Sequence, residues 1–179
     1  MHKNLPKIFY FISEFRNNEI SKLNKNVAII YRNYSIQYKE SEIKQIKNFC
    51  KKNNRKIYLA NNIKLALKLN LDGVYIPAFN KELTIRVFSN KKNFMVLGSA
   101  HNLNEIRLKE KQGVGAIFLS PIFKSIKSNK FLEIYRFKKL TNLTNKKIIA
   151  LGGISKNNQK RALKLPVHGF AGISYFKKV

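Results

Sequence analysis

The sequence has few acidic residues, no tryptophan and a single cysteine. Nine Asp and Glu residues stand against 36 Lys and Arg residues, so the formal net charge is +27. Because Cys50 is the only cysteine, an internal disulfide and a metal site built from several cysteines are both excluded. No apolar run reaches the roughly 18 residues that a membrane-spanning helix needs. The first residues are polar and lack a signal-peptide core, so we expect a cytoplasmic protein.

The excess of basic residues has two interpretations. It suits a polyanionic partner such as nucleic acid, a membrane or a phosphorylated substrate. The lysines are spread along the chain, however, and Lys, Asn and Ile are abundant together, as AT-rich coding would produce. The sequence has no clustered run of basic and aromatic residues of the kind that binds RNA. The charge therefore says little about function, and we expect neither a membrane nor a nucleic acid as a partner.

Short apolar runs alternate with amphipathic stretches along the whole chain. The runs are nearly continuous in apolar residues, which is typical of strands buried on both faces of a parallel sheet. The expected strands cover residues 7–12, 27–31, 56–60, 73–76, 94–98, 116–119, 148–151 and 169–173. The expected helices cover residues 40–52, 63–69, 104–112, 131–143 and 157–165. This order predicts a (β/α)8 TIM barrel, with a flavodoxin-like open sheet as the alternative.

The predicted barrel is small and forms one domain over residues 1–179. Such barrels typically have about 250 residues, so little chain is left for the first and last helices. We expect these helices to be reduced and to leave apolar surface near Phe9, Phe11, Phe170 and Phe176. A homodimer that covers this surface would remove it from water.

Small residues follow the last two predicted strands, where TIM barrels often bind phosphate. Gly152 and Gly153 follow the seventh strand, and Ser174 follows the eighth. Glycines let backbone N–H groups approach an anion closely, and the N-terminus of the next helix adds a favourable dipole. The alternative is a plain strand-to-helix turn with Ser155 as the helix cap. If phosphate binds here, valine at position 153 should occupy the anion position and abolish binding.

Several short motifs occur in a specific order and spacing. They are LDGVYI at residues 71–76, GSAHN at 98–102 with Glu105, SPIF at 120–123, IALGGI at 149–154 with Asn158, and GFAGIS at 169–174. Together they resemble the thiamine phosphate synthase/TenI family over most of the chain, and RNYS at residues 32–35 resembles a divergent branch of it. The resemblance implies a transferase of thiamine biosynthesis. It would join a thiazole phosphate to a hydroxymethylpyrimidine pyrophosphate and release pyrophosphate.

The resemblance also implies roles for particular residues. The thiazole phosphate would rest on the N–H groups of Gly153, Ile173 and Ser174, beside Gly152. Arg32 and Ser99 would face the pyrophosphate, because catalysis must neutralise the leaving group and align the two rings. The remaining candidates are Ser125 and Lys127 for the reacting molecules, Tyr34 for stacking on a ring or for packing, and His101 for orienting a substrate or for structure.

The sequence departs from the family at the expected Mg²⁺ ligands. Members commonly use two aspartates after the third and fourth strands, and the matching positions here are Asn61 (or Asn62) and Asn80. Two amides cannot neutralise Mg²⁺, a hard cation that favours carboxylate and phosphate oxygens. Asp72, the only aspartate, precedes the fourth strand at the opposite end of the barrel. We therefore expect no metal held by protein carboxylates; Mg²⁺ would instead arrive with the pyrophosphate.

Three interpretations of function remain open at this point. Lysines near residue 127 replace the metal and synthase activity persists, or the activity is lost and a non-catalytic phosphate-ligand-binding or regulatory protein remains. A TenI-type aminothiazole tautomerase is the third, but Pro121 stands where such members carry a histidine. Glu14 is the one carboxylate that could lie near the barrel mouth, but a surface or capping role is the one we expect for it. Cys50 and His168 are expected to be structural.

Overall fold

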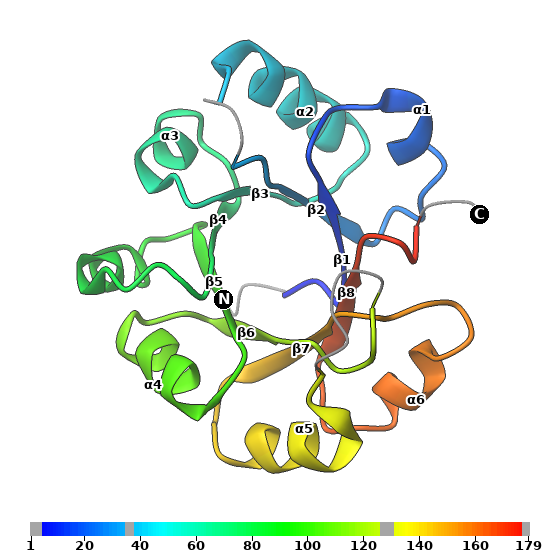
Figure 1. Cartoon of the computed structure of the whole chain (residues 1–179). Helices are drawn as coiled ribbons and strands as arrows, with labels where there is room; N and C mark the ends of the chain where they lie inside the picture. The colour runs from blue at the N-terminus through cyan, green and yellow to red at the C-terminus, as the bar shows by residue number, and fades with distance from the viewer. Residues whose placement is uncertain (1–4, 35–37, 126–130, 177–179) are drawn as a thin grey trace.

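A computed structural model describes residues 5–34, 38–125 and 131–176, and its strands form one closed parallel barrel. Each strand pairs with the next one along the chain. The barrel closes where β8 (Gly169–Gly172) pairs with β1 (Ile8–Ile12), and the helices surround the strands (Figure 1). The predicted TIM barrel is therefore confirmed, and the open sheet is excluded.

The other elements lie close to their predicted positions. The strands are β2 (Val27–Tyr31), β3 (Ile57–Ala60), β4 (Gly73–Ile76), β5 (Met95–Ala100), β6 (Ala116–Leu119) and β7 (Lys147–Leu151). The α-helices are α1 (Asn17–Ile20), α2 (Glu40–Lys52), α3 (Ile63–Lys68), α4 (Leu103–Lys111), α5 (Glu133–Asn142) and α6 (Gln159–Leu163). A 3-10 helix, η1 (Leu83–Phe88), follows β4. None of the described helices is long and apolar enough to cross a membrane.

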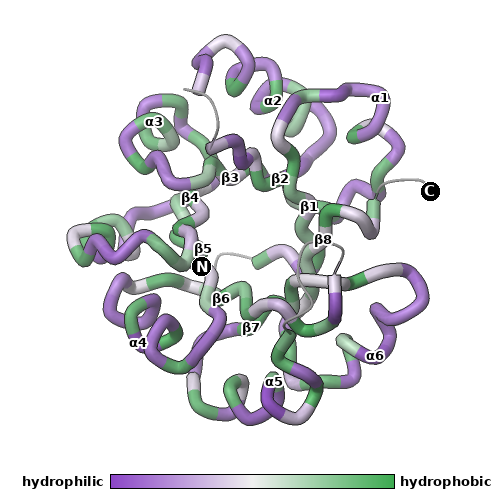
Figure 2. The backbone as a smooth tube through the Cα atoms, viewed as in Figure 1, coloured by the Kyte–Doolittle hydropathy of each residue, from purple (hydrophilic) through white to green (hydrophobic). Residues whose placement is uncertain are grey.

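Side chains alternate between the two faces of the barrel wall, because successive residues of a strand point to opposite sides. One set fills the interior, where the rings of Phe9, Phe11, Tyr75 and Phe118 pack mostly edge to face. The other set packs outward against the helices. Figure 2 shows hydrophobic residues along most of the strands, whereas the helices alternate between hydrophilic and hydrophobic residues.

The first and last helices of the barrel are reduced, as predicted. Helix α1 has four residues, and no helix follows β8 among the described residues. The prediction of exposed apolar surface there is nevertheless wrong. Phe9 and Phe11 fill the barrel interior, and Phe170 packs against the ring of Tyr175, with 4.9 Å between ring centroids. Phe176 is half-buried against the same outer core, so this region gives no support to a homodimer.

Polar side chains form hydrogen bonds at the end of the barrel where the strands begin. His168 Nε2 donates to the Leu5 carbonyl over 2.9 Å. The Asp72 carboxylate accepts from Lys56 Nζ over 2.7 Å and from the Ile57 N–H over 2.9 Å. His168 and Asp72 therefore have structural contacts at the end opposite to the predicted site.

Candidate active site at the C-terminal end of the barrel

Gly153 follows β7, and Ile173 and Ser174 follow the neighbouring strand β8, at the same end of the barrel. In the strand register Leu151 lies opposite Ala171, and the chain leaves β7 after Leu151 and β8 after Gly172. Neighbouring strands are about 4.8 Å apart, a distance that one phosphate group can span. Within the described part of the chain, no acceptor is hydrogen-bonded to the N–H of Gly153, Ile173 or Ser174. Unused N–H donors on the loops of two neighbouring strands are the kind of group that binds an anion.

The glycine pair after β7 is required by the backbone and by close packing. Gly152 and Gly153 have φ angles of +92° and +67°, in the left-handed region that favours glycine. A Cβ on Gly153 would lie 2.5 Å from the Phe123 carbonyl oxygen and 2.4 Å from that of Lys124. A valine at position 153 would therefore collide with the loop after β6, and the predicted loss of phosphate binding in this variant stays a prediction.

The side chain of Asn158 holds this glycine loop in place. Its Nδ2 donates to the Gly153 carbonyl over 2.8 Å, and its Oδ1 accepts from the Ser155 N–H over 2.8 Å. Helix α6 begins only at Gln159, so Ser155 is not its cap. The loop is thus more than a capped turn, because a dedicated side chain fixes the orientation of its peptide groups.

Arg32 and Ser99 lie at the barrel mouth, where alternation along β2 and β5 points them inward. The guanidinium carbon of Arg32 lies 4.7 Å from the centroid of the Phe11 ring, which belongs to the barrel interior. Ser99 is 4% exposed. Tyr75, on β4, points into the barrel interior below them, close enough for the Ser99 side chain and the Arg32 charge to act on its phenol. Burial raises the pKa of Tyr75, while Ser99 and Arg32 act in the opposite direction.

Tyr75 links two residues that the sequence pattern had singled out separately. Tyr75 is not among the site residues predicted from sequence, because the motif around it indicated a strand without giving the direction of its side chains. The signal was available, since Tyr75 lies on the inward-facing series of β4. The candidate site therefore has a phenol beneath Arg32 and Ser99 that the prediction did not include.

Two other candidates have protein contacts of their own. Tyr34 is 49% exposed and meets the ring of Phe79 edge to face, with 5.6 Å between centroids. His101 Nδ1 lies 2.8 Å from the Ser120 carbonyl oxygen. A carbonyl only accepts, so this nitrogen carries the hydrogen and Nε2 of the neutral ring is left as an acceptor. The contacts found are structural, and substrate roles for Tyr34 and His101 stay predictions.

The loop after β6 carries the last two candidates. Ser125 is half-buried in this loop, and Lys127 lies outside the described residues. Neither role is tested by the structure.

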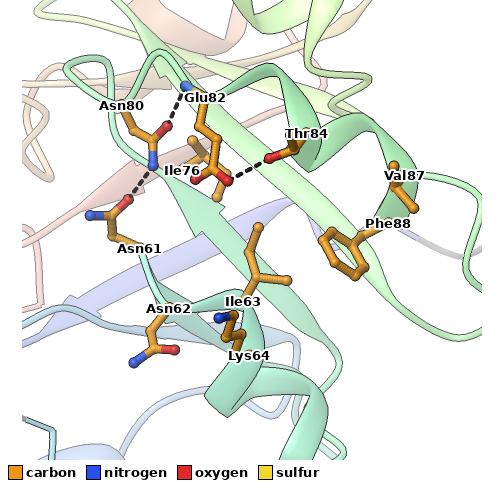
Figure 3. A pocket seen from close by; sticks show the side chains of 10 residues that line it. All are labelled: Asn61, Asn62, Ile63, Lys64, Ile76, Asn80, Glu82, Thr84, Val87 and Phe88. Atoms are coloured by element: carbon orange, nitrogen blue, oxygen red, sulfur yellow. Dashed lines mark hydrogen bonds between the residues drawn. The ribbon is translucent and has the colours of Figure 1, made fainter.

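The two positions that match the family's metal ligands lie side by side. Asn80 Nδ2 donates to Asn61 Oδ1 over 2.8 Å, and Asn80 Oδ1 accepts from the Glu82 N–H over 2.9 Å (Figure 3). Asn62 instead caps α3, accepting from the Leu65 N–H over 3.0 Å. The amide oxygens at both positions thus already accept hydrogen bonds, and neither side chain brings the negative charge that Mg²⁺ favours.

The described residues do not fit a protein-held Mg²⁺ ion. They contain no group of three or more His, Cys, Asp or Glu side chains that could hold a metal. Glu82 is the carboxylate nearest in sequence to Asn80, and it lines a cavity of about 470 Å³ with Asn61 and Asn80. Its carboxylate accepts from the Thr84 hydroxyl and turns toward it (Figure 3). Glu82 is therefore a carboxylate beside the amide pair that the prediction did not include, whereas Glu14 has the expected surface role, in an exposed ion pair with Arg16.

A buried lysine supports the loop that carries Asn80. Lys109 on α4 is 0% exposed, and its Nζ donates to Pro77 O, Asn80 O and Gln112 Oε1 over 2.8, 2.9 and 2.8 Å. Gln112 Nε2 donates to Asn80 O and to Glu82 O over 3.1 and 2.9 Å. Burial lowers the pKa of Lys109 to about 8. The three acceptors favour the charged form, which has three N–H groups to match them.

Comparison with known proteins identifies the family. The family model described as thiamine monophosphate synthase matches residues 20–176. The chain belongs to the thiamine monophosphate synthase family. A putative thiamine-phosphate synthase 2 of Aquifex aeolicus is 32% identical over 137 residues, covering 74% of this chain and 72% of the relative. A thiamine-phosphate synthase of Clostridium tetani is 27% identical over 195 residues, covering 97% of this chain and 90% of the relative.

Solved structures agree on the fold. The thiamine phosphate pyrophosphorylase of Pyrococcus furiosus superposes with a TM-score of 0.70 at 18% identity, covering 94% of this chain and 86% of that one. The resemblance drawn from the motifs is therefore confirmed at the level of the thiamine monophosphate synthase family. Three features of this chain bear on its function. They are the unused N–H groups of Gly153, Ile173 and Ser174, the cluster of Arg32, Tyr75 and Ser99, and the amide pair at positions 61 and 80.

Proposed function

We propose that this protein is a thiamine phosphate synthase-like transferase that joins a thiazole phosphate to a hydroxymethylpyrimidine pyrophosphate. The observation that carries the proposal is the corner formed by Gly153, Ile173 and Ser174, whose N–H groups no described residue accepts. It lies on the same rim as Arg32 and Ser99, which offer a cation and a hydroxyl to a second anionic group. Two anion-binding regions on one rim match two phosphorylated substrates.

The chemistry requires one bond to break and one to form. The C–O bond between the pyrimidine methylene and the pyrophosphate breaks, and its electron pair leaves with the pyrophosphate. The lone pair of the thiazole nitrogen then forms the C–N bond to the cation-like carbon. Arg32 would stabilise the growing negative charge on the leaving group, since a fixed cation at a partly dry site acts strongly on such charge. The phosphate corner would hold the thiazole in line for attack.

The proposal contains no step through a protein-held metal. Arg32, together with lysines such as Lys127, would supply the positive charge, and any Mg²⁺ would arrive on the pyrophosphate oxygens. The amide pair Asn61–Asn80 supports this part of the proposal, because its oxygens are engaged and uncharged. The proposal also places the enzyme in the cytoplasm, since the lone Cys50 is a free, buried thiol that needs no oxidising compartment.

A turnover assay with both purified precursors tests the proposal. We expect thiamine phosphate and pyrophosphate to appear in equal amounts, with turnover persisting in EDTA. The variant Arg32→Met removes this positive charge. It should lower kcat/KM by about a hundredfold, the usual cost of removing a charge-stabilising donor. The matched control is Arg136→Met on the exposed side of α5, which should leave turnover unchanged.

The same assay separates the alternative function. Tight binding of the thiazole phosphate with no turnover, with or without Mg²⁺, would show a non-catalytic phosphate-ligand-binding protein instead. No binding of either substrate would contradict both functions.

A further inference from the structure

We infer that Lys109 is a built-in cation that positions the loop between β4 and η1, residues 77–82, so that the site holds its pyrophosphate-bearing substrate without a divalent metal. The identity of that substrate rests on the proposed function. Lys109 does not touch the substrate in this scheme. It acts through the loop, as a positioning residue.

The hydrogen bonds of Lys109 tie the loop to α4. A buried ammonium is unfavourable unless its N–H groups find acceptors. Lys109 is fully buried, and two of its three acceptors are the carbonyls of Pro77 and Asn80, at 2.8 and 2.9 Å. The loop cannot move away from α4 without leaving a buried charge unpaired. A single side chain thereby fixes the backbone of the loop.

Asn80 is held at its side chain as well as at its backbone. Its carbonyl accepts from Lys109 and from Gln112 Nε2, the latter over 3.1 Å. Its side-chain Nδ2 donates to Asn61 Oδ1 over 2.8 Å, and its Oδ1 accepts from the Glu82 N–H over 2.9 Å. A metal ion bound between positions 61 and 80 would be one way to fix this wall of the site. Here hydrogen bonds from inside the protein do so.

The barrel wall makes room for this lysine. A Cβ on Gly98 of β5 would lie 2.8 Å from Lys109 Cδ, so the glycine leaves the space through which the lysine stem passes. Among the described residues Lys109 is the only buried lysine. The one other lysine on α4, Lys111, is exposed. The position of Lys109 is therefore specific to the loop it contacts.

The variant Lys109→Met, which keeps the length of the stem and removes the charge, tests the inference. We expect faster amide hydrogen exchange in residues 77–82 and at least about a tenfold weaker affinity for inorganic pyrophosphate by calorimetry, the effect of losing one charge-assisted hydrogen bond. For the synthase reaction the KM of the pyrimidine substrate should rise much more than kcat falls. Lys111→Met on the same helix is the matched control and should change none of these.

Several outcomes would overturn the inference. A folded Lys109→Met protein with normal loop protection and normal pyrophosphate affinity would do so, and so would a wild-type protein that does not bind pyrophosphate. If the variant does not fold, hydrogen exchange of the wild-type loop decides: equal protection in EDTA and in Mg²⁺ supports the inference, and protection that needs Mg²⁺ overturns it. A protein without synthase activity whose loop still loosens in Lys109→Met would contradict the proposed function alone.

Discussion

Cys50 illustrates how the surroundings of one residue decide its reactivity. It lies on α2, faces the core and is 1% exposed. Burial raises the pKa of its thiol to about 12, with the Arg55 charge acting in the opposite direction. The thiolate is the reactive species, so this cysteine is chemically silent in the folded protein at neutral pH.

Alkylation should therefore report unfolding. At pH 8 we expect iodoacetamide to modify native Cys50 at least about a hundredfold more slowly than the thiol of the urea-unfolded chain. Because its folded pKa is raised above the ordinary thiol value, the stability that it contributes is present below about pH 8.5 and is lost as pH rises toward 12. Cys50→Ala provides the unlabelled background for mass spectrometry. Equal rates for native and unfolded protein would show that Cys50 is accessible.

Residues of the site could be predicted from sequence only where a local pattern pointed to them. Arg32 and Ser99 follow from the motifs that resemble the family, and the structure brings both to the barrel mouth. Lys109 could not be found in this way. Nothing in its local sequence separates it from neighbouring lysines, and its acceptors lie 32 and 29 residues away. Long-range hydrogen bonds, rather than composition, distinguish it.

At the scale of elements, the end of β3 and the loop after β4 act as one unit. Asn61, directly after β3, has a φ of +56°, a left-handed conformation that asparagine tolerates better than most residues. Its side chain meets Asn80 across the gap between the two loops (Figure 3). Two aspartates at these positions would repel each other unless a cation lay between them.

The double variant Asn61→Asp/Asn80→Asp should therefore acquire Mg²⁺ binding. We expect calorimetry to detect binding to the variant and none to the wild-type protein. The variant's unfolding temperature should fall in EDTA and recover in Mg²⁺. The control Asn17→Asp/Asn18→Asp adds the same charge at exposed positions of α1 and should show neither effect. Wild-type protein that bound Mg²⁺ as well as the variant would contradict the interpretation of the amide pair.

The strands and helices α2 to α6 were predictable from sequence, whereas α1 and η1 were not. Continuous apolar runs placed every strand to within two residues, because burial on both faces leaves a strong signal. Helices α2 to α6 also lie within two residues of the expected ends. Helix α1 has only four residues, and η1 is a 3-10 helix whose three-residue repeat differs from the 3.6-residue α-helical pattern. In the loop between β4 and η1, Asn80 was singled out from sequence but its neighbours were not.

For the whole molecule, charge is the dominant unusual property. The formal net charge is +27, and the described residues form five ion pairs, most of whose side chains are well exposed. Exposed ion pairs contribute little stability, and the many remaining cations repel one another. The same field draws anions toward the protein. Salt should therefore act on folding and on binding in opposite directions.

Raising NaCl from about 0.05 M to about 0.5 M shortens the screening length roughly threefold. We expect the unfolding temperature to rise, because self-repulsion weakens, and the affinity for inorganic pyrophosphate to fall, because attraction weakens too. Calorimetry and thermal melts on one sample series measure both. Unchanged pyrophosphate affinity across the series would show that binding does not depend on exposed cations.

The seam between β1 and β8 sets an order of events during protein synthesis. Its contacts join residues far apart in the chain: His168 bonds to Leu5, 163 residues away, and the Phe170 N–H donates to the Lys7 carbonyl over 2.9 Å. Translation runs from the N-terminus, so β1 emerges from the ribosome long before its partner does. Until residues 169–172 follow, an apolar strand edge lies open to pairing with other nascent chains. The group of N–H donors from Gly153, Ile173 and Ser174, on the loops after β7 and β8, is accordingly the last part of the rim to form.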